Sequence, residues 1–346
     1  MEEPPARILN RHVAVDNVCA WPNLSVLPDG SVGALLFNKP SHGRLEGDIE
    51  FWTSAGGTEP WERRSVVTRH GPGTVRMNVA GGVSADGTIV ALVSGWDLGF
   101  PHPVRTDNIL PEVSVCISAD QGRTWARDGR FIPPEGGSRF MPFGNLIDSG
   151  GAWLAPAYDC RMSDPSPRSR RSSSYVFAST DGGRTWRARG LIGRDLFTET
   201  DILPTAGGWI AAARTLQDAE APDDPHASPC VRLFRGNADA SQWAAGPNLT
   251  VPGQHPGNLL RLRDGRIVFT CGSRVSGFYG VLARISADDG ESWGAPIIIC
   301  SDCLSGDMGY PSSVETDGGV VLTAYYAKET AGHSRYHMAT VRWLPG

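Results

Sequence analysis

The sequence lacks the features of secreted, membrane-spanning and nucleotide-binding proteins. Residues 1–5 contain no basic stretch followed by an apolar one, so no secretory signal is expected. No run approaches the ~18 apolar residues of a membrane-spanning helix. A G-x-G-x-x-G that opens a helix, a phosphate-binding G-x-x-x-x-G-K-[ST] loop and an H-E-x-x-H zinc motif are all missing. We therefore expect a cytoplasmic protein with no membrane partner and no cofactor.

Positive charge and paired cysteines are also scarce. Lys and Arg number 32 against 37 Asp and Glu, and the net charge of −5 disfavours a nucleic-acid-binding surface. Seven cysteines, an odd number spread widely, fit a reduced interior better than a disulfide framework. Cys300-Ser301-Asp302-Cys303 is a single C-x-x-C, and zinc sites of this type need a second pair. We expect two ordinary thiols there and no metal.

Glycine and proline are abundant, at 42 and 26 of 346 residues, and an eight-residue motif repeats. The motif reads S-x-D-x-G-x-[ST]-W. Three full copies occupy Ser118–Trp125, Ser179–Trp186 and Ser286–Trp293, and two degenerate copies occupy Ser54–Trp61 and Gly236–Trp243. The copies return every 50 to 64 residues, which indicates a repeat architecture.

The chemistry of the motif predicts a tight turn between antiparallel strands. An Asp side chain accepts hydrogen bonds from nearby backbone amides, and Gly adopts the positive φ that such a turn needs. The Trp then packs a large apolar surface beneath the turn. We therefore interpret the repeated Asp residues as structural and not as catalytic.

A second repeat alternates with the first and consists of Asp-Gly or Gly-Gly pairs followed by apolar strands, a hairpin signal. The pairs are Asp29-Gly30, Asp86-Gly87, Gly150-Gly151, Gly207-Gly208, Asp264-Gly265 and Asp317-Gly318. One unit is thus strand, hairpin, strand, loop, strand, turn, strand. Six such units predict an all-β protein, a six-bladed β-propeller of four-stranded antiparallel blades, as a single domain over residues 1–346.

In a propeller the loops before each first strand and after each second strand meet at one mouth of the central channel, a common place for ligand sites. The sequence places polar, aromatic and ionisable groups there. These include Trp21, Glu199, His255 and Tyr310 before first strands, and Arg214 and Arg274 after second strands. This composition predicts a carbohydrate site. Three long loops, 97–111, 159–174 and 215–230, are either walls of the site or solvated segments.

With these repeated turns on six blades, the chain resembles the sialidase (neuraminidase) superfamily, in which the motif is called the Asp box. The resemblance covers essentially the whole chain. It implies a Tyr nucleophile assisted by a Glu, an acidic residue that protonates the leaving group, and three Arg that bind the substrate carboxylate. A neutral phenol avoids the repulsion that a carboxylate nucleophile would meet at an anomeric carbon bearing a carboxylate.

Four residues match the motifs of that superfamily. Gly309-Tyr310-Pro311-Ser312 is similar to the segment that carries the nucleophile, with Tyr310 in its place. Thr198-Glu199-Thr200 is similar to the segment with the assisting Glu. Arg214 and Arg274 are similar to the second and third Arg of the carboxylate clamp, for which a planar guanidinium is well suited.

The chain departs from the superfamily at the first Arg and its supporting Glu. The stretch before the first hairpin has Trp21-Pro22 and no Arg, and Tyr325-Tyr326 stands where the supporting Glu is expected. The proton donor should lie between Lys39 and Asp48, where Glu46 falls near the expected place and Asp48 is the alternative. We expect Trp21 to form a platform for a sugar ring.

The sequence therefore predicts a sialidase-like, exo-acting glycoside hydrolase whose substrate is a glycan with an acidic or polar substituent. Tyr310, Glu199 and Glu46 are the expected catalytic residues; Arg214, Arg274, His255, Trp21 and Asp48 are expected to bind substrate. Two alternatives stay open. A uronate-directed lyase could use His255 or Tyr310 as its base, and a propeller with a decayed catalytic set would bind glycans without turnover.

Overall fold

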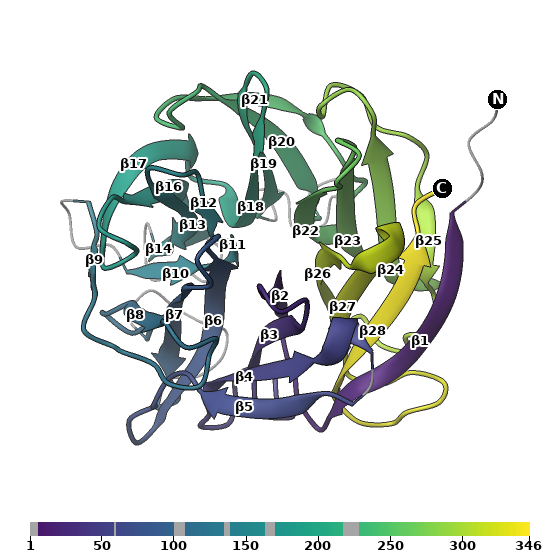
Figure 1. Ribbon diagram of the computed structural model, residues 1–346, viewed down its shortest axis with the longest axis horizontal. Helices are drawn as coiled ribbons and strands as arrows, with labels where there is room; N and C mark the ends of the chain where they lie inside the picture. The colour runs from purple at the N-terminus through teal and green to yellow at the C-terminus, as the bar shows by residue number, and fades with distance from the viewer. Residues whose placement is uncertain (1–5, 59, 100–107, 135–138, 163–169, 217–227) are drawn as a thin grey trace.

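The computed structural model describes residues 6–58, 60–99, 108–134, 139–162, 170–216 and 228–346. Within them, six mainly antiparallel sheets stand in a ring around a central axis, and the strand that begins each meander lies toward that axis (Figure 1). The protein is an all-β, six-bladed propeller, as the two repeats predict. No helix in the described part of the chain is both long and apolar enough to cross a membrane.

Each blade is built around a meander of consecutive strands. Blade one contains β2 (Asn23–Val26), β3 (Val32–Phe37), β4 (Ile49–Ser54) and β5 (Glu62–Val66). Blade two contains β6 (Thr74–Val83), β7 (Ile89–Asp97), β8 (Ser114–Ser118) and β11 (Gly144–Asn145). Blade three contains β9 (Arg130–Ile132), β10 (Phe140–Pro142), β12 (Ile147–Asp148), β13 (Trp153–Asp159), β16 (Ser174–Ser179) and β17 (Thr185–Gly193).

The second half of the ring is more regular. Blade four contains β18 (Phe197–Thr205), β19 (Gly208–Thr215), β20 (Val231–Gly236) and β21 (Trp243–Asn248). Blade five contains β22 (Gln254–Arg261), β23 (Ile267–Val275), β24 (Phe278–Ser286) and β25 (Ile297–Cys300). Blade six contains β26 (Met308–Glu315), β27 (Val321–Ala327), β28 (His337–Leu344) and β1 (Arg7–Asp16). A separate pair is β14 (Arg161–Met162) with β15 (Arg170–Arg171), and short 3-10 turns are η1 (Ala55–Gly57) and η4 (Asp317–Gly319).

The repeated turns have the predicted chemistry. In the turn after β8, Asp120 Oδ1 accepts hydrogen bonds from the Arg123 and Thr124 amides at 3.0 and 2.9 Å, and Thr124 Oγ1 donates to Oδ2 at 2.6 Å. Gly122 has the expected positive φ of 81°. The hydrogen bonds from Thr124, and those from Ser118 and Arg123, lower the pKa of Asp120 to about 2. Trp125 is buried beneath the turn. Both oxygens of the Asp120 carboxylate accept hydrogen bonds from within the turn, which supports the interpretation of this Asp as structural.

The ring closes through a strand that the sequence reasoning missed. β1 pairs antiparallel with β28, from Arg7 opposite Leu344 to Asp16 opposite His337, so the N-terminal strand completes blade six. Figure 1 shows the purple β1 alongside the yellow β28. This closure explains why blade six lacks the S-x-D-x-G-x-[ST]-W turn, because its fourth strand does not follow β28 in the chain.

Blades two and three share strands in a way that the repeat did not predict. β9 follows the turn at Trp125 but pairs in parallel with β17 of blade three, and β11 pairs in parallel with β6 of blade two. Among the described residues, only the bridge between Ile117 and Ala126 continues blade two outward.

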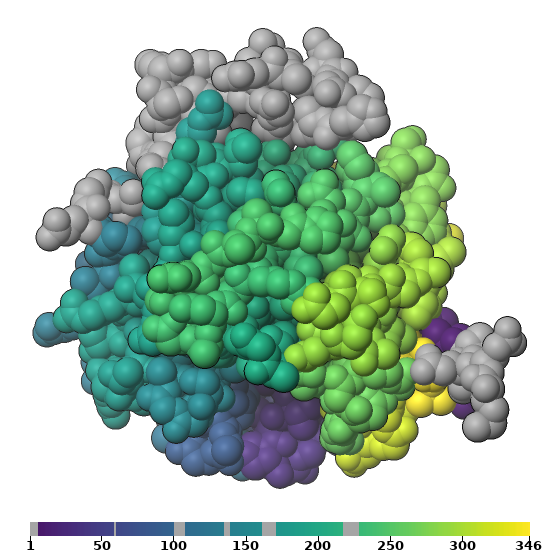
Figure 2. Space-filling model, turned by 90° about the horizontal axis from the view of Figure 1, so that it is seen from above, coloured from purple at the N-terminus to yellow at the C-terminus, as the bar shows by residue number. Residues whose placement is uncertain are grey.

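Seen from the side of the ring, the later blades lie side by side in chain order from teal to yellow (Figure 2).

Apolar clusters fill the space between neighbouring blades. One of them packs Leu203, Ile210 and Leu233 of blade four against Leu259 and Phe269 of blade five. Parts of the three long loops, 100–107, 163–169 and 217–227, lie outside the described residues, and their role as walls stays a prediction.

Candidate active site

The first strands and second-strand ends bring six of the predicted site residues to one mouth of the channel. Glu199 lies on β18, His255 on β22 and Tyr310 on β26, while Trp21 directly precedes β2. Arg214 and Arg274 lie near the ends of β19 and β23.

A hydrogen-bonded triad forms the centre of this mouth. The Tyr310 hydroxyl donates to Glu199 Oε1 at 2.8 Å, and Arg214 Nη1 donates to the same oxygen at 3.0 Å. Arg214 Nη1 also lies 3.5 Å from the Tyr310 hydroxyl oxygen. The phenol proton therefore points at a carboxylate that a guanidinium neutralises. A hydroxyl that donates to a carboxylate, which is held in turn by a third group, can serve as a nucleophile with its base.

The electrostatics of the triad set its protonation state. Burial alone would raise the pKa of Glu199, but the Arg214 guanidinium and hydrogen bonds from Thr198 and Tyr310 outweigh it and lower the pKa to about 2. Burial and the Glu199 charge raise the pKa of Tyr310. At neutral pH Glu199 is therefore a carboxylate and Tyr310 a neutral phenol, and Glu199 Oε1 accepts the hydrogen bond of that phenol.

Trp21 packs flat on the ring of Tyr310. The two ring centroids are 4.2 Å apart and the planes are inclined by 9°. Both residues have positive φ, 46° for Trp21 and 52° for Tyr310. Bulky residues rarely adopt this backbone conformation, and each instance costs about 1–3 kcal/mol. Strain of this kind is concentrated at functional sites, where the surrounding structure holds it in place.

Arg274 and His255 lie beside Tyr310. The Arg274 guanidinium carbon is 5.6 Å from the centroid of the Tyr310 ring, and Arg274 Nε donates to the Met308 carbonyl at 3.1 Å. Within the described part of the chain, Arg274 forms no ion pair with a carboxylate, unlike Arg214. Burial and the charges of the two arginines lower the pKa of His255 far below its usual range, so its imidazole is neutral.

Several buried polar atoms around Tyr310 have no hydrogen-bond partner among the described residues. They are Trp21 Nε1, Glu199 Oε2, Arg214 Nε, His255 Nδ1 and Arg274 Nη2. Leaving one buried polar atom unpaired costs about 1–3 kcal/mol. Such a concentration of donors and acceptors in one place is typical of a site that a polar ligand completes.

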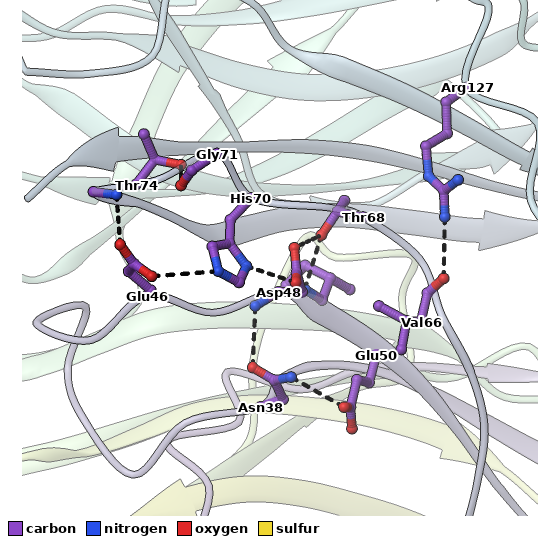
Figure 3. Close-up of polar contacts among 12 residues, drawn as sticks. Asn38, Glu46, Asp48, Glu50, Val66, Thr68, His70, Gly71, Thr74 and Arg127 are labelled. Atoms are coloured by element: carbon purple, nitrogen blue, oxygen red, sulfur yellow. Dashed lines mark hydrogen bonds and ion pairs between the residues drawn. The ribbon is translucent and has the colours of Figure 1, made fainter.

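Glu46 and Asp48 lie in a different network, between blades one and two. Figure 3 shows His70 between them: His70 Nδ1 is 2.7 Å from Asp48 Oδ2, and His70 Nε2 is 3.7 Å from Glu46 Oε2. Thr68 Oγ1 donates to Asp48 Oδ1 at 3.0 Å, and the Gly73 amide donates to Glu46 at 2.5 Å. No hydrogen bond or ion pair within the described residues joins either carboxylate to Tyr310. Sequence reasoning did not identify His70.

A second missed group lies closer to Tyr310. His42, in the same loop as Glu46, contacts the edge of Trp21 with ring centroids 4.9 Å apart. His42 Nδ1 is 2.9 Å from Asp307 Oδ1, which also accepts a hydrogen bond from the Tyr326 hydroxyl at 2.7 Å. Tyr336 donates to the other oxygen of Asp307. Tyr326 is one of the two tyrosines that stand where the resemblance implies a supporting Glu, and its hydroxyl binds Asp307. The position of His42 in the loop expected to hold the acid was the available signal.

Comparison with known proteins identifies the fold. No protein-family profile and no curated protein sequence match the chain. A protein of unknown function from Dyadobacter fermentans superposes with a TM-score of 0.81 at 21% identity, over 99% of this chain and 100% of that one. A Trypanosoma rangeli sialidase in complex with sialic acid gives a TM-score of 0.69 at 13% identity, over 99% of this chain but only 57% of the sialidase.

An arabinanase has the same architecture. The Penicillium chrysogenum alpha-L-arabinanase complexed with arabinobiose gives a TM-score of 0.65 at 12% identity, over 98% of both chains. Identities this low show a shared fold and leave the activity open. The protein is a sialidase-like, six-bladed β-propeller.

Proposed function

We propose that the protein is an exo-acting glycoside hydrolase that cleaves a terminal sugar bearing an acidic or polar substituent. The observation that supports this most strongly is the hydrogen bond of 2.8 Å from the Tyr310 hydroxyl to Glu199 Oε1. Tyr310 attacks the anomeric carbon and Glu199 takes its proton, while the glycosidic C–O bond breaks. Water then attacks the glycosyl–tyrosine intermediate and restores the phenol. A phenol nucleophile relayed by Glu is a recognised exception among glycosidases.

The substituent is bound mainly by Arg274. Arg214 is paired with Glu199, whereas Arg274 Nη2 is buried without a partner among the described residues. Trp21 Nε1 adds a neutral donor in the place where sialidases have an Arg. A hydrogen bond from a neutral donor is about half as strong as a charge-assisted one. The site is therefore suited to a single, weakly held acidic or polar group.

Two groups are candidates for the proton donor to the leaving oxygen. Glu46 is the one that the sequence predicts. His42 is the other, and its contact with Trp21 and its hydrogen bond to Asp307 favour it. A carboxylate that holds one nitrogen of an imidazole leaves the other nitrogen to exchange a proton with substrate. Asp48 then serves to orient His70.

The low basicity of His255 favours hydrolysis over elimination. A lyase needs a base that is free to take a proton from carbon, but the lowered pKa of His255 makes it a weak base. The hydrogen bond from Tyr310 to Glu199 favours a catalytic role over a purely binding one.

The test is turnover of a panel of fluorogenic glycosides, with sialic acid, uronic acids and neutral sugars as the released groups. Each reaction is read for free sugar and for an ultraviolet-absorbing unsaturated product. Released sugar without unsaturated product supports the proposal. Unsaturated product would show a lyase, and tight glycan binding with no turnover of any substrate would show a binding protein.

A further inference from the structure

The loop that leads into blade six contains a cluster outside the mouth. Cys300 ends β25, and Asp302 and Cys303 follow it in the loop before β26. The two thiol sulfurs and one carboxylate oxygen of Asp302 all lie within 4.8 Å of one another. Among the described residues, this is the one group of three or more His, Cys, Asp or Glu side chains close enough to share a metal ion. The sequence pattern, with a single C-x-x-C, did not predict it.

The two thiols are buried and interact directly. Cys300 is 8% exposed and Cys303 6%. The Cys300 sulfur lies in hydrogen-bonding contact with both the Cys303 thiol and the Tyr325 hydroxyl. Thiolate, and not thiol, is the metal-binding form of cysteine.

Asp302 is held in place by the closing strand of the ring. Arg11 on β1 donates through Nη1 to Asp302 Oδ2, and through Nε to the Tyr325 hydroxyl at 2.6 Å. The other carboxylate oxygen, Asp302 Oδ1, is buried and has no partner among the described residues. The carboxylate thus has one oxygen fixed by an arginine and one left to bind something else. Metal-ligating carboxylates are oriented by such outer hydrogen bonds.

We propose that Cys300, Cys303 and Asp302 form a zinc site, with Arg11 and Tyr325 as its outer shell. Thiolate and carboxylate are established ligands of Zn²⁺, with Zn–S near 2.3 Å and Zn–O about 2.0–2.2 Å. Two thiolates and a carboxylate carry three negative charges, which one Zn²⁺ and the Arg11 guanidinium offset. Binding releases the two thiol protons to solvent. A water molecule would complete the tetrahedral coordination, since the Asp302 side chain is 34% exposed.

The position of the site gives the metal a structural role. It joins β1, which closes the ring, to the loop between β25 and β26. That loop ends at Asp307, which binds His42 and Tyr326 at the mouth. A metal at Cys300 and Cys303 would therefore fix both the closure of blade six and the loop that supplies Asp307. The proposal does not depend on the proposed glycosidase activity.

The test is titration of the reduced, metal-free full chain with Co²⁺ and then Zn²⁺. We expect one Co²⁺ per chain, a near-ultraviolet sulfur-to-cobalt charge-transfer band, and displacement of Co²⁺ by one Zn²⁺. Cys303→Ser should abolish the band. Arg11→Ala should weaken zinc binding by about 10- to 100-fold, as loss of an outer-shell partner does. Cys116→Ala, which removes an isolated buried thiol of blade two, is the matched control and should bind as the parent does.

Two results would overturn the proposal. One is the absence of stoichiometric binding in the reduced protein, with equal behaviour of the parent and Cys303→Ser. The other is formation of a Cys300–Cys303 disulfide on exposure to oxidised glutathione that one equivalent of Zn²⁺ does not slow. If Cys303→Ser fails to fold, Asp302→Asn answers the same question, because it keeps both thiols and removes one ligand. Unchanged zinc affinity in Asp302→Asn would remove the carboxylate from the site.

Discussion

Tyr310 and Glu199 are 111 positions apart in the chain, yet the hydroxyl of one donates to the carboxylate of the other at 2.8 Å. They come from blades six and four, and Arg214 binds the same carboxylate oxygen. In the proposed hydrolysis, Tyr310 is the neutral nucleophile, Glu199 is the charged base, and Arg214 is the cation that keeps this base charged. This pairing is the relationship on which the proposed hydrolysis depends.

Loss of either member of the pair should remove turnover. We expect Tyr310→Phe and Glu199→Gln each to lower kcat by about 100-fold or more, since proton transfer by a positioned group contributes at least that much. Steady-state kinetics on the best substrate of the glycoside panel would measure it. Tyr175→Phe, in blade three, and Glu315→Gln, at the other end of β26, are the matched controls. Full activity in Tyr310→Phe would eliminate the nucleophile assignment.

Trp21→Arg should shift specificity toward carboxylate-bearing sugars. A hydrogen bond to a charged group contributes about 1.5–3 kcal/mol, so kcat/KM for a sialoside relative to an uncharged glycoside should rise by roughly tenfold. Loss of the stack on Tyr310 should also lower the free energy of unfolding by about 0.5–1.5 kcal/mol. The ratio of the two kcat/KM values and a denaturant titration test both parts. An unchanged ratio would show that Trp21 lies outside the path of the substituent.

The proton donor can be identified by the leaving group. We expect His42→Asn to lower kcat/KM by about 100-fold for a glycoside with an alkyl leaving group and far less for an aryl one, because a phenol departs without protonation. Glu46→Gln should leave both rates close to the parent values. The reverse pattern, with Glu46→Gln sensitive to the leaving group, would return the acid role to the residue that the sequence predicts.

The low pKa of Glu199 makes stability depend on pH in a defined window. Its pKa falls from an ordinary 4.5 to about 2 on folding. The stabilisation by the carboxylate is therefore complete above about pH 5 and is lost as the pH falls toward 2. We expect the difference in Tm between the parent and Glu199→Gln to shrink across this interval. A constant difference from pH 7 to pH 3 would contradict the low pKa.

Asp201 should matter for stability and not for chemistry. Its carboxylate, buried on β18, accepts hydrogen bonds from the Asn145 amide at 2.7 Å, the Leu259 amide at 2.7 Å and Asn258 Nδ2 at 2.8 Å. It thereby joins blade four to blade five and to β11, the strand that pairs with β6 of blade two. Asp201→Asn places an NH₂ group against these donors and should cost about 1–3 kcal/mol of unfolding free energy.

Denaturant titration would measure the effect of Asp201→Asn. Asp148→Asn, at an exposed position of the third hairpin, is the control and should change the free energy of unfolding by less than about 0.5 kcal/mol. Equal stability of the two variants would show that Asp201 does not hold the blades together.

The local features of this protein follow from the sequence because they depend on neighbours in the chain. The turn at Asp120 needs only an Asp, a Gly and a Thr within a few residues, and its hydrogen bonds are those that the motif predicts. The six Asp-Gly or Gly-Gly hairpin pairs predict the number of blades. Tyr310, Glu199, Arg214 and Arg274 were found from their places before first strands and after second strands, which the same repeat defines.

Contacts between distant segments were decided only by the tertiary structure. Three contacts join residues that are far apart in the chain: the pairing of β1 with β28, the hydrogen bond between His42 and Asp307, and the hydrogen bond from Arg11 to Asp302. Glu46 was assigned from its position in a loop, but that loop turns His42 toward Trp21 and Glu46 toward His70. A repeat fixes where each loop begins and ends, whereas the direction of a side chain within it depends on packing against blades that the local sequence does not specify.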